Sequence, residues 1–272
     1  MLACEYSLRT VCNAENCGES IPEDPMSKVF LIASGKGGTG KTMFAVNFGA
    51  LLAAGGKRVA LIDMDLGMRN MDLYLGMENR VVFNIMDVLS GICKLNKALL
   101  KVRGFDSLYF MAAPPRKDER RITSRHMKAL CDILEKYFDY IIIDCGAGIG
   151  EPLEASVEVA DQAVIVTEPE IASLRDADTL ASWLLDHGLR DSWMIVNKVD
   201  MDLIQEGIVP DMMSIVNNAT TPIAGFIQMD KNIRISTNRG VPVATQIGTP
   251  VHQLLQEISE RITSQEVPAT VL

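Results

Sequence analysis

Long apolar runs are missing from this chain of 272 residues. No stretch approaches the roughly 20 consecutive apolar residues that a helix needs to cross a bilayer. The N-terminal region holds no continuous apolar segment, so it does not resemble a secretory signal. We therefore expect a cytoplasmic protein without a transmembrane helix.

Paired cysteine motifs and an excess of positive charge are also missing. The six cysteines show no C-x-x-C spacing, which favours reduced thiols. The formal net charge is −9, and an acidic surface repels nucleic acid and anionic lipid. The densest basic stretch, residues 116–128, also carries acidic side chains and predicts a solvated loop that leads into a helix. Nucleic acid is therefore not an expected partner.

The chain does contain a phosphate-binding motif. Residues 35–42 read Gly-Lys-Gly-Gly-Thr-Gly-Lys-Thr, which fits the pattern G-x-x-x-x-G-K-[ST] between an apolar strand and a helix-like run. We expect Lys41 to reach the β- and γ-phosphates and the Thr42 hydroxyl to bind Mg²⁺. The predicted nucleotide-binding residues of this loop are Gly35, Lys36, Gly37, Gly38, Thr39, Gly40, Lys41 and Thr42.

Short apolar strands alternate with helix-length segments from residue 28 onward. Most are continuous apolar runs, which is typical of strands covered on both faces. The predicted strands are 29–34, 58–63, 107–112, 140–144, 162–167, 193–197 and 223–228. This alternation predicts an α/β fold with a doubly wound, mostly parallel sheet of the P-loop NTPase class. We expect a flexible N-terminal extension over residues 1–26, one ATPase domain over residues 27–264 and a short tail over residues 265–272.

Three aspartates lie at or just beyond predicted strand ends, where ligands bind in such sheets. Asp144 fits a Walker B aspartate, and we expect Asp63 and Asp144 to hold Mg²⁺ through water together with Thr42. Asp65 leads into a loop and is the predicted residue for orienting the hydrolytic water. The alternative is that one of these carboxylates only caps a turn.

Lys36 is a second lysine in a loop that needs one. At this position it can point away from its own nucleotide and toward a facing subunit. A positive group delivered across an interface stabilises charge on the transferred phosphoryl group. We therefore assign Lys36, Lys41 and Asp65 to catalysis, with the alternative that Lys36 is a solvated loop residue.

Residues 35–42 resemble the deviant Walker A motif of the MinD/ParA ATPases, whose signature is the extra lysine. The resemblance covers about residues 28–262 and is closer to the MinD branch than to plasmid ParA proteins. Further similar runs are residues 63–73, 80–83, 95–100, 144–149, 168–178 and 236–243. The resemblance implies slow hydrolysis of Mg-ATP by a nucleotide-sandwich homodimer, with Asn197 contacting adenine. It also implies recruitment of a MinC-like division inhibitor, placement of the septum, and a peripheral location at the inner face of the cell membrane.

Two positions and the C-terminal helix depart from the family pattern. Met43 stands where the family often has a second threonine, and Gly146 stands where it usually has proline. The stripe formed by Val251, Leu254, Leu255, Ile258 and Ile262 predicts a helix whose polar face is acidic. Such a helix suits packing on the sheet better than the basic membrane helix that MinD proteins usually have, which leaves the membrane contact open.

Other functions remain open at this stage. FlhG-like control of flagellar number and ParA-like DNA partition share the phosphate loop, although the net charge opposes DNA binding. The nitrogenase iron-protein type also shares it, but the cysteines lack the flanking glycines of that class. Asp200 completes an N-K-x-D sequence with Asn197, the guanine-reading pattern of GTPases, and so keeps GTP open.

Overall fold

The computed structural model describes residues 27–66, 68–115 and 121–264. The predicted extension over residues 1–26 and the predicted tail over residues 265–272 lie outside the described residues. Part of the basic stretch, residues 116–120, does so as well.

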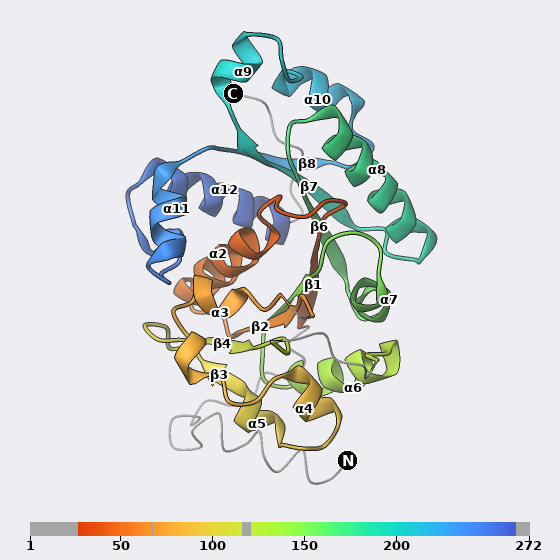
Figure 1. Cartoon of the computed structure of the whole chain (residues 1–272), viewed down its shortest axis with the longest axis vertical. Coiled ribbons are helices and arrows are strands. Elements are labelled where there is room, and N and C mark those ends of the chain that lie inside the picture. The colour runs from red at the N-terminus through yellow and green to blue at the C-terminus, as the bar shows by residue number, and fades with distance from the viewer. Residues whose placement is uncertain (1–26, 67, 116–120, 265–272) are drawn as a thin grey trace.

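One mixed sheet of eight strands forms the centre of the described structure (Figure 1). Its order is β3-β4-β2-β5-β1-β6-β7-β8, and every neighbouring pair is parallel except β3 and β4. The strands are β1 (Lys28–Ala33), β2 (Val59–Met64), β3 (Leu99–Lys101), β4 (Leu108–Met111), β5 (Tyr140–Cys145), β6 (Gln162–Thr167), β7 (Ser192–Val199) and β8 (Ile223–Gln228). The predicted doubly wound, mostly parallel sheet is confirmed, and all seven predicted strands are present.

β3 was not predicted from the sequence. It is three residues long and pairs antiparallel with β4 at the edge of the sheet, where Leu99 lies opposite Met111. So short a strand carries no periodicity of its own, and only its pairing with β4 defines it.

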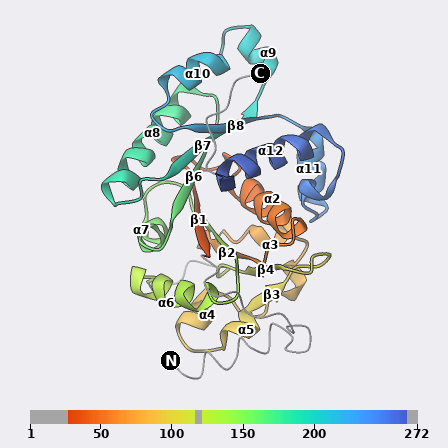
Figure 2. The same ribbon diagram turned by 180° about the vertical axis from the view of Figure 1, so that it is seen from behind.

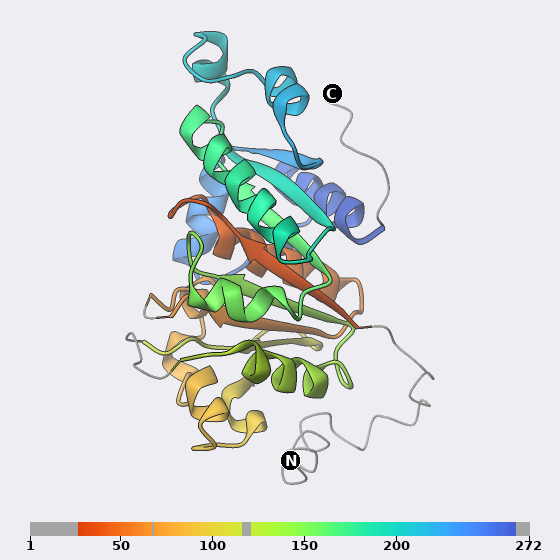
Figure 3. The same cartoon turned by 90° about the vertical axis from the view of Figure 1, so that its right-hand side faces the viewer.

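Helices cover both faces of the sheet. Figure 1 shows α2, α11 and α12 on one side of the strands and α6, α7 and α8 on the other, and the view from behind in Figure 2 agrees. In Figure 3 the layer of α6, α7 and α8 stands in front of the sheet. The longer helices are α2 (Lys41–Ala54), α6 (Ser124–Leu134), α7 (Glu151–Val157), α8 (Ile171–Asp186), α10 (Met212–Asn218), α11 (Lys231–Asn238) and α12 (Pro250–Ser264). The shorter ones are α3 (Met71–Tyr74), η1 (Glu78–Arg80), α4 (Ile85–Leu89), α5 (Leu95–Ala98), α9 (Met201–Gln205) and η2 (Val243–Thr245).

Each face of the sheet has its own hydrophobic core. Phe30 and Ile32 of β1 point to the core that α2 and α12 cover, whereas Val29 and Leu31 point to the core under α6, α7 and α8. Alternate residues of one strand are therefore buried on opposite sides. This is why the strands read as continuous apolar runs in the sequence.

The last described helix, α12, packs on the sheet as its apolar stripe predicted. Val251, Leu255, Ile258 and Ile262 are buried, and Leu254 packs beside them. The helix contacts α2 and β8. Among the described residues, no helix is long and apolar enough to span a membrane.

Candidate functional site

The phosphate loop connects β1 to α2 at the carboxyl end of the central strands. The hydroxyl of Ser34, the residue after β1, donates a hydrogen bond to the carbonyl of Lys36 at 2.7 Å. The backbone carbonyl of Ser34 accepts a hydrogen bond from the N–H of Gly148 at 2.8 Å. Gly40 caps α2 with a φ of 97°, a left-handed conformation that favours glycine. The predicted strand, loop and helix are therefore confirmed, with Lys41 and Thr42 in the first turn of α2.

Two side chains from the end of β7 donate hydrogen bonds to backbone carbonyls of the phosphate loop. The Asn197 amide donates to the carbonyl of Thr39 at 2.7 Å, and a Cβ at Gly40 would lie 2.2 Å from the same amide nitrogen. The Lys198 ammonium donates to the carbonyl of Gly38 at 2.6 Å and to Glu168 at 2.7 Å. The residues Asn197 and Lys198 therefore fix the shape of the phosphate loop. The contribution of Lys198 and Glu168 was missed from the sequence.

Thr42 and Asp144, two of the residues predicted to hold magnesium, lie in contact. The Thr42 hydroxyl donates to Oδ2 of Asp144 at 2.6 Å. Oδ1 of Asp144 is buried and has no hydrogen-bond partner among the described residues. Burial raises the pKa of Asp144 to about 7, although the Thr42 hydrogen bond and the charge of Lys41 both lower it. A buried carboxylate oxygen without a protein partner, beside a threonine hydroxyl, fits the hydrated shell of Mg²⁺.

Asp63 lies opposite Asp144 in the pairing of β2 with β5. Its carboxylate accepts the backbone N–H of Asp65 at 3.0 Å and that of Met71 at 3.4 Å. Burial raises the pKa of Asp63 well above its usual range, and the charge of Asp144 raises it further. In this structure Asp63 thus positions the loop that carries Asp65.

Asp65 lies beside the turn after β5. A Cβ placed on Gly146 would be 3.3 Å from Oδ1 of Asp65, so the glycine leaves room for this carboxylate. Asp65 is only partly buried, whereas Asp63 and Asp144 are fully buried. Of the three aspartates it is therefore the one that solvent can reach.

Lys36 lies on the outside of the loop and contacts α8 of its own chain. Its Nζ is 3.1 Å from Oε2 of Glu170, the residue that precedes α8, and both side chains are about half exposed. The hydrogen bond and the charge of Glu170 raise the pKa of Lys36. Nothing in the sequence around either residue indicates this pair.

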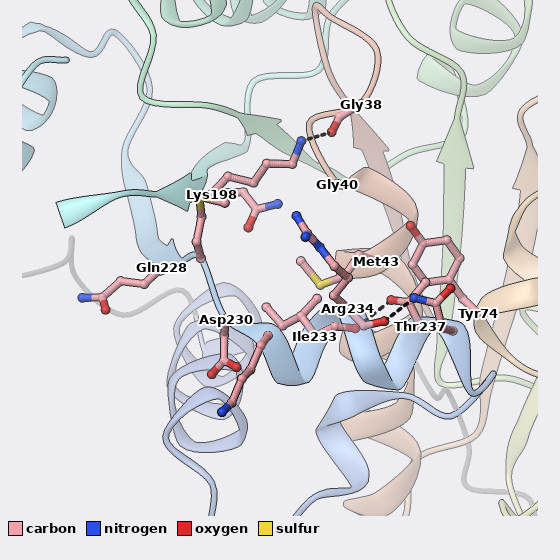
Figure 4. Close-up of a pocket in the computed structure, with 14 residues that line it drawn as sticks. Gly38, Gly40, Met43, Tyr74, Lys198, Gln228, Asp230, Ile233, Arg234 and Thr237 are labelled. Carbon is pink, nitrogen blue, oxygen red and sulfur yellow. Dashed lines mark hydrogen bonds between the residues drawn. The ribbon is translucent and has the colours of Figure 1, made fainter. Parts of the chain in front are cut away.

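A cavity of about 560 Å³ adjoins the phosphate loop. The loop, the end of β7, the end of β8 and one face of α11 line it (Figure 4). The lining residues are Gly38, Gly40, Met43, Tyr74, Asn197, Lys198, Gln228, Met229, Asp230, Lys231, Ile233, Arg234, Thr237 and Asn238. A nucleotide whose phosphates occupy the loop has space here for its remaining part.

The carboxylate of the N-K-x-D sequence does not line this cavity. Asp200 caps α9 instead, where its Oδ1 accepts the N–H of Asp202 at 3.0 Å. The aspartate that lines the cavity is Asp230, which follows β8. The spacing of the sequence motif could not show which of these two aspartates lines the cavity.

The described cysteines lie in the hydrophobic core or pack against it. Cys131 and Cys145 are buried and Cys93 is partly buried, all three as free thiols. Within the described residues, no group of three or more histidine, cysteine, aspartate or glutamate side chains is arranged to hold a metal ion. This burial opposes the arrangement in which exposed cysteines bridge a cluster between subunits.

Comparisons with known proteins agree with this geometry. The model of the CobQ/CobB/MinD/ParA nucleotide binding domain matches residues 30–243. The septum site-determining protein MinD of Bacillus subtilis strain 168 is 36% identical over 249 residues, which are 91% of this chain and 93% of that protein.

Two solved structures are similar throughout. In the MinC:MinD cell division protein complex of Aquifex aeolicus, the matching chain has a TM-score of 0.80 and 34% identity, with 90% of this chain and 99% of that chain covered. The septum site-determining protein MinD of Pyrococcus horikoshii OT3, complexed with Mg-ADP, has a TM-score of 0.77 and 26% identity, with 90% and 100% covered.

Proposed function

The chain belongs to the CobQ/CobB/MinD/ParA family of nucleotide-binding domains, and on this premise we propose that it is a MinD-type ATPase. It dimerises on Mg-ATP, hydrolyses ATP slowly, and positions the division septum by recruiting a MinC-like inhibitor. The observation that carries the proposal is the similarity to MinD over nine-tenths of the chain, including a MinD solved in complex with MinC.

We assign the phosphate end of the site by residue. The loop of residues 35–42, which includes Lys41, binds the phosphates. Lys36 of the same loop acts across the dimer interface. Thr42 and Asp144 hold Mg²⁺, with Asp63 beside them through water. The contact between Thr42 and Asp144 and the unpartnered Oδ1 of Asp144 support this assignment. When bound, the metal neutralises charge on the phosphates.

Asp65 is the residue that we assign to hydrolysis. Its backbone is fixed by Asp63, while its carboxylate faces the turn after β5 and remains partly exposed. A carboxylate in this state can accept a hydrogen bond from a water and orient it for in-line attack.

Adenine is the base that we propose for the cavity. Asp200, the residue that would read guanine, caps α9 and does not line the cavity. The MinD relative solved with Mg-ADP supports an adenine nucleotide. In this proposal Asn197 contacts the adenine and also donates a hydrogen bond to the carbonyl of Thr39 in the phosphate loop.

A peripheral position at the inner face of the cell membrane is a separate part of the proposal. α12 does not supply the contact, because its apolar stripe is buried against β8 and α2. Localisation of a fluorescent fusion, with and without residues 1–26, tests this part.

The central experiment measures ATP hydrolysis and mass together. Light scattering after size exclusion should show a monomer with ADP and a dimer with Mg-ATP, and the dimer should retain a MinC-type partner in a pull-down. The matched control is Lys41→Ala, which should remain monomeric. A wild-type chain that neither hydrolyses ATP nor dimerises would contradict the proposal.

A further inference from the structure

A cationic side chain outside the sequence motifs enters the cavity beside the phosphate loop. Arg234 lies on the face of α11 that lines this cavity, together with Ile233, Thr237 and Asn238. Figure 4 shows its side chain extending away from the helix toward Gly40. It therefore points at the end of the cavity where a nucleotide joins the loop.

The guanidinium of Arg234 has no ion-pair partner in the part of the chain that the structure describes. Within the described ranges, no carboxylate forms a salt bridge with it, and no protein acceptor takes a hydrogen bond from it. Asp230, one turn earlier on the same face, instead caps α11 by accepting the N–H of Asn232 at 2.6 Å. An unpaired guanidinium directed into a cavity is available to an anionic ligand.

Two other polar side chains near the phosphate loop already donate to protein acceptors. Lys198 is occupied by the carbonyl of Gly38 and by Glu168. The amide of Asn197 donates one hydrogen bond to the carbonyl of Thr39. Met43, in the first turn of α2, presents a thioether and no donor. Lys231 also lines the cavity as a cation, and of these two side chains Arg234 is the one that Figure 4 shows extending toward Gly40.

The way in which phosphate loops bind nucleotides indicates which phosphate lies nearest to this cavity. The loop N–H groups cradle the α- and β-phosphates, and the motif lysine reaches the β- and γ-phosphates. The α-phosphate therefore lies farthest from Lys41 and nearest to the part of the cavity that receives the nucleoside. A guanidinium can bind two phosphate oxygens at once, which a lysine cannot do.

We infer that Arg234 contacts the α-phosphate of the bound nucleotide. The inference rests on the proposed nucleotide binding and extends it by a binding residue from α11. This contact would couple α11 to the phosphate loop only when a nucleotide is present.

Calorimetric titration of the full chain with Mg-ADP tests the contact without hydrolysis. Arg234→Ala should bind Mg-ADP about 10–100-fold more weakly, which is the usual effect of losing a hydrogen bond to a charged group. Arg234→Lys keeps the charge and should recover part of the loss. The control is Arg239→Ala, which removes a charge at the end of α11 outside the cavity lining and should bind as the wild type does.

The two diastereomers of ADPαS identify the phosphate. Sulfur accepts hydrogen bonds poorly, so the wild type should discriminate against one diastereomer, and Arg234→Ala should lose that discrimination. Wild-type affinity in Arg234→Ala would overturn the inference alone. If Arg234→Ala binds more weakly but still discriminates between the diastereomers, Arg234 contacts the nucleoside, and the α-phosphate contact is overturned. A wild-type chain that does not bind Mg-ADP would instead overturn the proposed function, and this contact with it.

Discussion

Lys36 and Glu170 form an ion pair in which Nζ and Oε2 are 3.1 Å apart, although 134 positions separate them in the chain. The pair ties the outer side of the phosphate loop to the start of α8. Lys36 cannot serve a facing subunit while it contacts Glu170, so its proposed role across the interface requires this pair to open. Because both side chains are exposed, the pair is weak and opens easily.

Glu170→Gln should release Lys36 and favour the dimer. We expect the dissociation constant of the ATP-dependent dimer to fall by about two- to fivefold, the range for an exposed ion pair. Sedimentation velocity at several protein concentrations measures it, with Glu158→Gln, the exposed residue after α7, as a charge-matched control. Weaker dimerisation in Glu170→Gln would mean that Glu170 itself belongs to the interface.

The two lysines of the loop should separate binding from assembly. Lys41→Ala should abolish nucleotide binding, because it removes the charge that holds the β- and γ-phosphates. Lys36→Ala should bind nucleotide as a monomer but lose dimerisation and turnover. Sedimentation with Mg-ATP distinguishes the variants, and a Lys36→Ala protein that dimerises and hydrolyses normally would contradict the role across the interface.

Asp65→Ala should trap the ATP-bound dimer. The substitution removes the carboxylate that we assign to the attacking water but leaves Lys41 and the loop intact. The dimer should persist for many wild-type turnover times, since the γ-phosphate contacts are not lost. Size exclusion after ATP loading follows its decay. Hydrolysis at the wild-type rate would reassign this role to Asp63 or Asp144.

Asp200 and Asp230 offer a matched test of base recognition. Each caps a helix, but only Asp230 lines the cavity. Asp200→Ala should lower the free energy of unfolding by about 0.5–2 kcal/mol through the lost cap and leave the ratio of ATP to GTP affinity unchanged. Asp230→Ala should also change nucleotide affinity. Calorimetric titration with both nucleotides decides this, and a selective loss of GTP affinity in Asp200→Ala would show that Asp200 reads the base after all.

Ile258→Ala should affect stability and not membrane binding. Ile258 is fully buried and packs directly on Gly225 of β8, where a Cβ would be 2.6 Å from its side chain. The truncation should lower the free energy of unfolding by about 2–5 kcal/mol. Urea denaturation measures this, with the exposed Glu257→Ala as the control. Selective loss of vesicle binding by the folded variant would show that α12 contacts lipid.

The sequence by itself determined the seven longer strands and the phosphate loop. The strands are continuous apolar runs because each is buried on both faces, and this pattern is local. The loop at residues 35–42 needs a fixed order of glycine, lysine and threonine, so its chemistry is also local. Asp63 and Asp144 could be placed near it because the carboxyl ends of parallel strands meet at one edge of the sheet.

Only the tertiary structure decided which distant side chains meet. The short β3 exists through its pairing with β4, and the partner of Lys36 comes from the start of α8. Asp200 and Asp230 both follow strands, yet the cavity receives only Asp230. Arg234 lines the cavity beside the phosphate loop from a helix nearly two hundred residues later in the chain. Such contacts depend on strand order and on the packing of helices over the sheet, and no local spacing of residues encodes either of them.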